Sequence, residues 1–368
     1  MAGARHLYVH LPFCASRCGY CDFVTVVGRS GEHGSYVDAL LAELALERGR
    51  LAPALESVYL GGGTPSLTDA AALERLLREL PAAEELTVEA NPETVTPELA
   101  RLLVRGGVDR VSLGAQSFQP HLLEVLERRA RPADVRRAVE LLRAAGLDNL
   151  SLDLIYGIPG QTADDLERDL GEALALEPEH VSAYELEAKP GTRFTHAHGT
   201  ELAVQADAME GYFELVVDRL TAAGFRWYET ANFCRVGDRD LRARHNLGYW
   251  LARDYLGLGV GAVSTCDGLR WRNAPSLRGY VEALGRGGAP ARELEELDDA
   301  VRAAERLLLG LRLDEPLALS GLEGALDPAA LERLAAGGLV VSDGTALTLT
   351  RRGRFLGGGV TAELLTSV

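Results

Sequence analysis

Three cysteines within eight residues constrain this chain more than any other feature. Cys14, Cys18 and Cys21 have the spacing C-x3-C-x2-C. Three thiolates this close together can hold one soft metal centre from a single side. A cubane of four irons bound by three thiolates leaves one iron without a protein ligand, and that iron can bind a substrate. The spacing therefore favours an iron–sulfur cluster that takes part in chemistry.

A structural zinc site is the main alternative, because zinc prefers four closed ligands and His10 could supply the fourth. It is less favoured, since the chain has no second C-x2-C pair and no second histidine at zinc-finger spacing. Unliganded core cysteines are also disfavoured, because three of the five cysteines lie in this one run. Cys234 and Cys266 stand alone and are interpreted as ordinary thiols.

The composition bounds the size, the compartment and the partners of the protein. The chain has 368 residues, 47% of them hydrophobic, which allows one large domain and a small one. Its formal net charge of −16 argues against nucleic-acid binding. No apolar run approaches the roughly 20 residues of a membrane span, and the first residues lack a signal-peptide core. Five cysteines, three of them clustered, do not form a disulfide pattern. We therefore expect a cytoplasmic protein.

Short apolar runs alternate with helical patterns along the first half of the chain, which predicts an α/β fold with a parallel sheet. The expected strands span residues 7–10, 57–61, 85–90, 110–115, 149–156 and 180–185, and the expected helices 36–48, 70–80, 97–105, 133–144 and 164–176. Six units are too few for a closed eight-stranded barrel, so we expect an open, partial (β/α)6 barrel. Chemistry in such barrels occurs at the C-terminal ends of the strands.

A Gly- and Pro-rich stretch at 285–290 is interpreted as a linker. We expect residues 1–284 to form the barrel, with an extension from about residue 190, and residues 291–368 to form a second domain. In that domain, helices at 297–309 and 328–335 precede a hairpin that turns at Asp343-Gly344, an order that is winged-helix-like. Residues 291–368 hold eight arginines and thirteen acidic residues, so packing or a lid role is favoured over DNA binding.

Polar and Gly-rich motifs follow the expected strands. The run 61–65, Gly-Gly-Gly-Thr-Pro, lets backbone approach a ligand closely. Glu89 and Asp153 could accept hydrogen bonds from ribose hydroxyls or an amine, and Gln116 could bond a polar ligand edge. Arg128 could pair with a carboxylate. Each of these side chains could instead be an ordinary strand end, a loop cap or part of a surface salt bridge. Together, however, they are expected to surround one opening of the barrel beside the cysteines.

A second unusual cluster is His245-Asn246-Leu247-Gly248-Tyr249-Trp250. A histidine with two aromatic residues four and five positions later could ligate haem iron while the rings pack on the porphyrin. From the residues alone, a satisfied core histidine on an aromatic helix face is the favoured interpretation.

These motifs together resemble those of the radical S-adenosylmethionine proteins. The cysteine run with Tyr20 and Phe23, Gly-Gly-Gly-Thr-Pro, Glu89, the run 112–118 and the run 153–161 (Asp-Leu-Ile-Tyr-Gly-Ile-Pro-Gly-Gln) carry the resemblance. It is closest to the oxygen-independent coproporphyrinogen III oxidases and their relatives, the HemW-type haem chaperones, and it covers nearly the whole chain.

Two features favour the HemW type within that group. The true dehydrogenases carry a further cysteine two positions after the third, where this chain has Phe23. The HemW-like proteins carry His-Asn-x-x-Tyr-Trp, which is associated with haem binding and is intact at 245–250. The resemblance thus makes His245 the favoured haem ligand, with Asn246, Tyr249 and Trp250 beside it.

The resemblance also implies a set of site residues. Cys14, Cys18 and Cys21 would hold a [4Fe-4S] cluster, and the S-adenosylmethionine pocket would be formed by Tyr8, Phe23, Gly62, Gly63, Thr64, Glu89, Gln116, Arg128 and Asp153. Electron delivery from the cluster would cleave S-adenosylmethionine to methionine and a 5'-deoxyadenosyl radical.

The chain departs from the family pattern at two histidines. Ala130 stands where relatives usually have a histidine after the arginine, and Val263 stands where many have another. These absences leave a second axial haem ligand unassigned. We expect a protein that binds haem and passes it to acceptor proteins, some of which could be membrane-bound, and that needs an electron donor. Coproporphyrinogen III oxidase activity and a radical methyltransferase of similar layout are the enzyme alternatives, and a zinc-stabilised binding module is the third.

Overall fold

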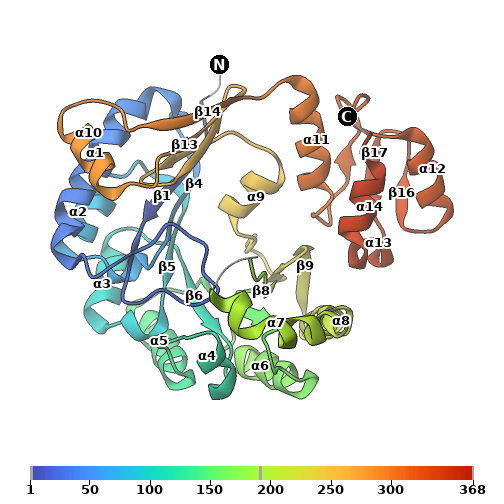
Figure 1. Cartoon of the computed structure of the whole chain (residues 1–368), viewed down its shortest axis with the longest axis horizontal. Helices are drawn as coiled ribbons and strands as arrows, with labels where there is room; N and C mark the ends of the chain where they lie inside the picture. Colours follow the sequence, from blue (N-terminus) through green and yellow to red (C-terminus); the bar gives the residue numbers. More distant parts are fainter. Residues whose placement is uncertain (1–2, 190–192, 367–368) are drawn as a thin grey trace.

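The computed structural model describes residues 3–189 and 193–366, and one 12-stranded sheet runs through most of it (Figure 1). The strand order is β14-β13-β12-β11-β1-β4-β5-β6-β7-β8-β10-β9. The bounds of its strands are β1 His6–Leu11, β4 Leu55–Gly62, β5 Ala83–Ala90, β6 Arg110–Gln116, β7 Leu150–Tyr156, β8 His180–Glu185, β9 Phe225–Glu229, β10 Asn232–Arg235, β11 Tyr255–Leu258, β12 Val263–Cys266, β13 Leu269–Asn273 and β14 Arg292–Glu296.

Six parallel strands, β1 and β4 to β8, form the partial barrel that the sequence predicts. Helices follow the strands and cover the outer face of the sheet (Figure 1). Their bounds are α1 His33–Glu47, α2 Ala70–Glu79, α3 Pro97–Arg105, α4 Pro120–Val125, α5 Pro132–Ala145 and α6 Ala163–Ala175. The main hydrophobic core lies between these helices and the outward side chains of the strands, such as Val88, Val111 and Leu152. The predicted α/β fold class is confirmed.

The inward side chains of the barrel are polar. Successive residues of a strand face opposite sides of a sheet, and alternate residues line an interior cavity: Thr87 and Glu89 on β5, Arg110 and Ser112 on β6, Ser151 and Asp153 on β7, and His180 and Ser182 on β8. Burying so many polar groups is unfavourable unless they bond to one another, to water or to a ligand. Several of them do bond to one another, as the Ser151 hydroxyl and the His180 ring do at 2.8 Å.

Six further strands extend the sheet beyond the predicted ones. β9 and β10 pair antiparallel with each other and with β8, and β11 pairs parallel with β1. β12, β13 and β14 continue that side antiparallel. The remaining helices of this part are α7 Arg193–Ala206, α8 Met209–Ala222, α9 Arg244–Trp250 and α10 Leu277–Gly285. The predicted linker at 285–290 is followed by β14, which pairs with β13 of the main sheet. The sheet thus extends to Glu296, and we place the domain boundary near Leu297.

The C-terminal unit contains α11 Asp299–Gly310, α12 Pro328–Ala336 and a small sheet, the winged-helix-like order that the sequence predicts. The sheet order is β15-β17-β16, with β15 Leu317–Ala318, β16 Val340–Ser342 and β17 Ala346–Leu349. Helix α14 Gly357–Leu364 completes its separate hydrophobic core, while Phe355 of α13 Arg351–Phe355 packs against the main core. Figure 1 shows this unit beside the barrel, on the side of α9 and β9.

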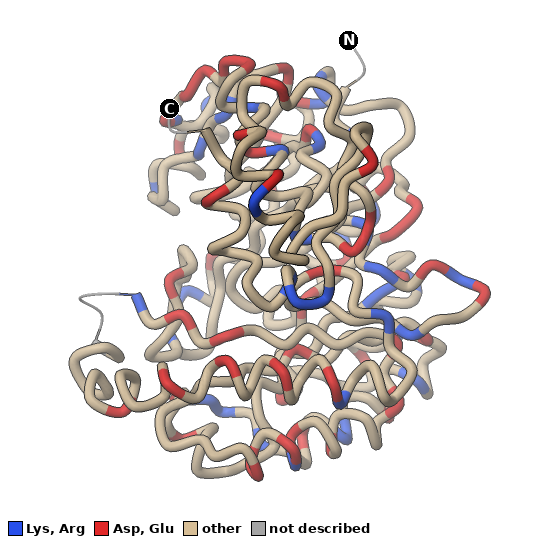
Figure 2. Tube along the Cα trace, turned by 90° about the vertical axis from the view of Figure 1, so that its right-hand side faces the viewer, with Lys and Arg blue, Asp and Glu red and all other residues tan. Residues whose placement is uncertain are grey.

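Acidic and basic residues are interspersed over the side of the molecule shown in Figure 2. Among the described residues, no helix is long and apolar enough to cross a membrane.

Candidate functional site

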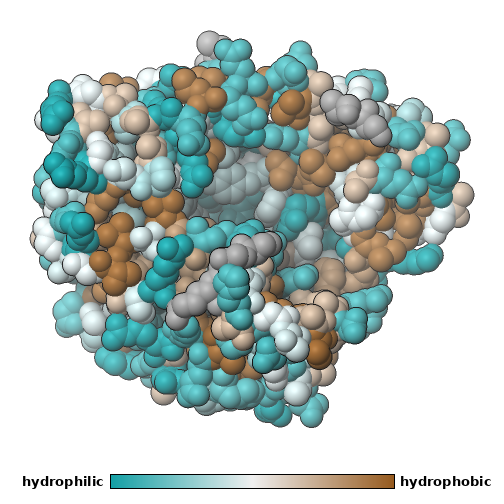
Figure 3. All heavy atoms as spheres, viewed as in Figure 1, coloured by the Kyte–Doolittle hydropathy of each residue, from teal (hydrophilic) through white to brown (hydrophobic). Residues whose placement is uncertain are grey.

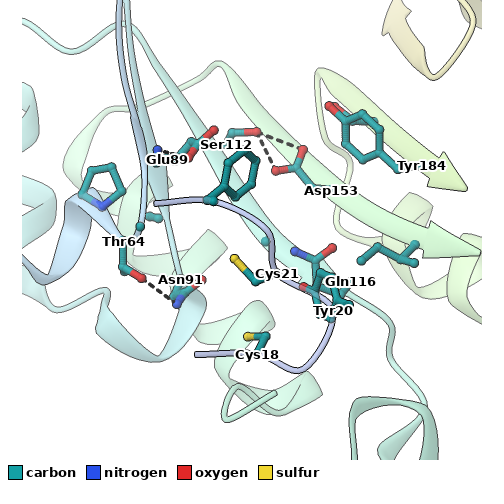
Figure 4. Close-up of a pocket in the computed structure, with 18 of the residues that line it drawn as sticks. Cys18, Tyr20, Cys21, Thr64, Glu89, Asn91, Ser112, Gln116, Asp153 and Tyr184 are labelled. Atoms are coloured by element: carbon teal, nitrogen blue, oxygen red, sulfur yellow. Dashed lines mark hydrogen bonds between the residues drawn. The ribbon is translucent and has the colours of Figure 1, made fainter. Parts of the chain in front are cut away.

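The three clustered cysteines lie on one loop at the C-terminal ends of the barrel strands. The loop is bracketed by two short parallel strands, β2 Phe13–Cys14 and β3 Val26–Val27. All three thiols are free and half-buried, and they line one cavity of about 420 Å³ with the strand ends. Figure 4 shows Cys18 and Cys21 in front of the strands that carry Glu89 and Asp153, and Figure 3 shows the molecule hollowed near the middle of one face.

The donor set suits a cluster with an open iron better than a closed zinc site. His10 is buried, and both of its ring nitrogens are engaged: Nδ1 lies 3.0 Å from the Tyr8 hydroxyl and Nε2 lies 2.8 Å from the carbonyl oxygen of Val24. His10 therefore has no free ring nitrogen to serve as a fourth metal ligand. Within residues 3–189 and 193–366, no three His, Cys, Asp or Glu side chains already converge as a metal site, so the thiols must draw together to bind one.

A hydrogen-bonded chain links two of the cysteines through the strand ends. The Cys14 thiol lies 3.5 Å from the Thr64 hydroxyl, which accepts a bond from the Asn91 amide at 3.2 Å. Asn91 in turn accepts from Arg128 at 2.9 Å, and the other guanidinium nitrogen of Arg128 lies 3.7 Å from the sulfur of Cys18. This places a cation and a hydroxyl beside thiols that would carry negative charge as thiolates.

The glycine run after β4 allows the backbone to approach both the loop and the cavity. Gly62 has a φ of 111°, and a Cβ there would lie 2.5 Å from the His10 ring. A Cβ at Gly63 would lie 2.6 Å from the Pro12 carbonyl. Both positions therefore require glycine.

Glu89 and Asp153 face the cavity from β5 and β7. Glu89 accepts hydrogen bonds from the Tyr59 hydroxyl at 2.7 Å and from the Gly62 backbone at 3.1 Å. Burial raises the pKa of Glu89 to about 7, with the nearby Asp153 adding to the rise and both hydrogen bonds opposing it. Such a carboxyl changes charge near neutral pH, which suits a group that binds a cationic or hydroxyl-bearing ligand.

Asp153 has a similar environment. The Ser112 hydroxyl lies 3.0 Å from each of its carboxylate oxygens (Figure 4). Burial raises the pKa of Asp153 to about 6, while the bonds from Ser112 and Ser182 lower it.

Gln116 ends β6 in a left-handed backbone conformation, with a φ of 65°. The register to β7 shifts at this point, between Gly114 and Gln116. Such a conformation is uncommon outside glycine and is found where a site over-determines it. Here it turns the strand end at the cavity that Gln116 lines.

Two predicted pocket residues differ from the rest. Phe23 lines the cavity but is 60% exposed. Tyr8 is not among the lining residues: it lies beside Tyr59 on the neighbouring strand β1, with the two rings stacked and their centroids 6.3 Å apart.

The predicted haem residues lie on α9, which closes the N-terminal end of the barrel. His245 is buried, with Nδ1 2.9 Å from the Ser57 hydroxyl and Nε2 2.9 Å from the Tyr249 hydroxyl. Burial lowers the pKa of His245 to about 3, so its imidazole is neutral. Trp250 lies beneath Arg312, whose guanidinium is 4.4 Å from the ring centroid. Of the four predicted haem residues, only Asn246 lines the cavity.

Comparison with known proteins places this arrangement in a family. A model of the radical SAM superfamily matches residues 8–173, and one of the HemN C-terminal domain matches residues 297–356. The haem chaperone HemW of Mycobacterium tuberculosis (strain ATCC 25618 / H37Rv) is 39% identical, over 98% of this chain and 94% of its own length. That of Bacillus subtilis (strain 168) is 33% identical, over 98% and 99% respectively.

This chain belongs to the HemW family of radical SAM proteins.

The HemW fold is shared with a solved structure. Coproporphyrinogen III oxidase (HemN) from Escherichia coli superposes with a TM-score of 0.81, over 98% of this chain and 90% of the other, at 23% identity. At that identity the likeness concerns the fold alone. Radical SAM membership implies a [4Fe-4S] cluster and S-adenosylmethionine, and the three free thiols and the polar cavity fit both.

Several residues of this HemW-family site were not singled out from the sequence. Asn91 joins Thr64 to Arg128 through hydrogen bonds. The sequence does offer a signal for it, because Asn91 lies in a Glu-Ala-Asn-Pro run at the end of β5. Ser112 begins the 112–118 run and could have been found in the same way. Tyr59 and Arg110 are ordinary strand residues in the sequence, and only the strand register shows that they face the cavity.

Proposed function

We propose that this chain binds haem and delivers it to acceptor proteins. One observation carries this proposal: the relatives that match 98% of this chain's length are named haem chaperones. The intact His-Asn-x-x-Tyr-Trp run and Phe23, in place of the dehydrogenase-type cysteine, agree with it.

In this proposal Cys14, Cys18 and Cys21 hold the [4Fe-4S] cluster, which when bound supplies the electron for cleavage of S-adenosylmethionine. Glu89 and Asp153 accept hydrogen bonds from the amine or ribose hydroxyls, Arg128 balances negative charge beside the thiols, and the glycines at 62 and 63 admit the ligand. Thr64 and Gln116 fix its polar edge, and Phe23 covers the exposed side.

Haem ligation by His245 requires a local change in α9. Nε2 is bonded to Tyr249 within a buried cluster, so an iron can reach it only if the hydroxyl of Tyr249 moves away. Because the imidazole is neutral, it needs no proton loss to become a ligand. Trp250 and the C-terminal unit cover the outer side of α9, so the opening involves that unit as well.

The acceptors and the electron donor are proteins of a cytoplasmic setting in this proposal, with brief contact to acceptors at a membrane. All five cysteines are free thiols, which agrees with a reducing compartment.

The test is a haem titration and a coproporphyrinogen III assay on one anaerobically purified sample. We expect a haem Soret band that shifts or weakens in His245→Ala, and no decarboxylation by the wild-type protein. An unchanged spectrum in His245→Ala would remove His245 from the ligand role. Robust decarboxylation would favour coproporphyrinogen III oxidase instead, the alternative that the shared fold and the polar cavity keep open.

A further inference from the structure

The cavity continues past the strand ends into the barrel interior. Arg110, Ser151, His180 and Ser182 line this inner part, and Ala243 and Asn246, at the start of α9, close it. None of these residues belongs to the cluster loop or to the predicted S-adenosylmethionine set, and only Asn246 belongs to the predicted haem set. We call this inner part of the same cavity the inner chamber, and it lies below the predicted cofactor site.

Arg110 is the cation of this chamber. Its side chain is among the largest fully buried ones, at 1% exposure. Nη1 donates to the Asn149 side-chain oxygen at 3.2 Å and to the Leu241 carbonyl oxygen at 3.1 Å, both neutral groups. Nη2 is buried and has no hydrogen-bond partner among the described residues.

No carboxylate of the described residues lies within ion-pair distance of Arg110. Glu85, two positions before Thr87 on the neighbouring strand, accepts instead from the Arg244 backbone at 3.0 Å. Asp153 is held by Ser112. Burial raises the pKa of Glu85, and the charge of the nearby Arg110 opposes the rise. A buried guanidinium with a free N–H edge is costly unless an anion completes it.

Asn246 offers a second free polar group in the same chamber. It lines the cavity, and its side-chain amide has no hydrogen-bond partner in the part of the chain that the structure describes. Its neighbour His245 is fully engaged in the core, so Asn246 is the member of the His-Asn-x-x-Tyr-Trp run that reaches the chamber. A planar anion can accept from a guanidinium edge and from an amide N–H at once.

We propose that the inner chamber binds a carboxylate, with Arg110 Nη2 and the Asn246 amide as donors. The carboxylate belongs either to a small organic acid or to the propionate arm of a tetrapyrrole. In both cases the ligand would approach the predicted S-adenosylmethionine site from below, through the interior of the barrel.

The first arm of the test uses formate as the probe, on the cluster-reconstituted full-length protein. Thermal unfolding is followed in sodium formate and in sodium chloride at equal ionic strength. Formate should raise the midpoint above chloride, with a saturable dependence at an apparent Kd on the order of 1 mM. Arg110→Met should weaken that dependence at least tenfold, while Arg110→Lys, which keeps the charge, should retain part of it.

Asn246→Asp serves as the second variant, because it changes almost no packing volume and places the protein's own carboxylate in the cavity that Arg110 also lines. It should abolish the formate effect, and it decides the question even if Arg110→Met does not fold. A formate effect that is absent from the wild-type protein, or equal in wild type and Asn246→Asp, overturns the carboxylate site.

The second arm distinguishes the two sources and rests on the proposed haem binding. Haem and haem dimethyl ester are titrated into wild type and Arg110→Lys. A loss of about tenfold or more on esterification, seen in wild type and reduced in Arg110→Lys, identifies a tetrapyrrole propionate. Equal affinities, alongside the formate effect, identify a small acid. Failure to bind either haem form contradicts the proposed function, while the formate result still supports or overturns the chamber.

Discussion

Nε2 of His245 and the hydroxyl oxygen of Tyr249 lie 2.9 Å apart, one helical turn from each other on α9. On its other side His245 shares the Ser57 hydroxyl with Nδ1 of His6, which lies 2.8 Å away. Ser57 has one proton to give, so the tautomers of the two histidines are coupled. If Ser57 donates to His6, His245 carries its proton on Nδ1 and its lone pair on Nε2, the form that can ligate a metal.

Tyr249→Phe therefore separates two roles of His245. The change leaves buried Nε2 without a partner, which should lower the free energy of unfolding by about 1–3 kcal/mol. If Nε2 ligates haem, the same change should strengthen haem binding, because no hydrogen bond has to break first. Chemical denaturation and a haem titration measure the two effects. Tyr255→Phe is the control, since Tyr255 packs against Tyr249 and makes no bond to His245. Weaker haem binding by Tyr249→Phe would count against ligation.

Cys18→Ala should remove the cluster. Anaerobically purified wild type should be brown, with iron and acid-labile sulfide at about four each per chain, as a cubane requires. The variant should be colourless yet folded, because Cys18 is half-buried in a loop. Cys234→Ala is the matched control and should stay brown, since Cys234 lies in the core away from the loop. Stoichiometric zinc without labile sulfide would show that the site is not an iron–sulfur centre.

Asp153→Ala should weaken S-adenosylmethionine binding without changing cluster content. A lost charge-assisted hydrogen bond costs about 1.5–3 kcal/mol, which is roughly tenfold or more in Kd. Calorimetry on the reconstituted protein measures the affinity, with Asp148→Ala as a control because Asp148 is exposed and precedes β7. Equal affinities for wild type and Asp153→Ala would remove Asp153 from the pocket.

Glu89 should make both stability and ligand binding depend on pH. Its folded pKa of about 7 lies above the ordinary value of 4.5. The folded protein then binds more protons than the unfolded chain between these values, so this group makes stability fall as pH rises from 4.5 to 7. Glu89→Gln should flatten that decline in ligand-free protein.

Binding of S-adenosylmethionine should show the opposite trend through the same group. Ionised Glu89 is the better hydrogen-bond acceptor, so affinity should increase as pH rises through about 7, and Glu89→Gln should remove the increase. Calorimetry at several pH values gives the comparison. A rise that persists unchanged in Glu89→Gln would assign it to another group.

The barrel could be predicted from the sequence because its strands are short apolar runs between amphipathic helices with clear starts. Thr162 and Asp165, for example, form a capping box at the start of α6. The strands β13 and β14 could not, because their runs are short and mostly charged: Leu-Arg-Trp-Arg-Asn has only two apolar residues on one face, and Arg-Glu-Leu-Glu-Glu has only one apolar residue. They exist through pairing with each other and with β12, which no local pattern records.

The candidate site was predictable at its rim and unpredictable in its interior. Cys14, Glu89 and Asp153 lie in recognisable runs at strand ends. The bond between Ser57 and His245 joins residues 188 positions apart, so it becomes visible only once β4 and α9 are placed. The residues alone favoured a core histidine at 245, which the structure bears out, but they could not name its partner Ser57 or show that its neighbour Asn246 lines the cavity.

The place of β1 in the sheet has a consequence for how the protein is made. His6 pairs with Ser57 on one side and with Tyr255 on the other. Since a chain emerges from the ribosome N-terminus first, one edge of β1 stays without its partner until residue 258 has been synthesised. The cysteine loop, which directly follows β1, is thus synthesised well before β11, the strand that pairs with β1 on that edge. Iron delivered during translation would meet the thiols while one edge of β1 is still unpaired.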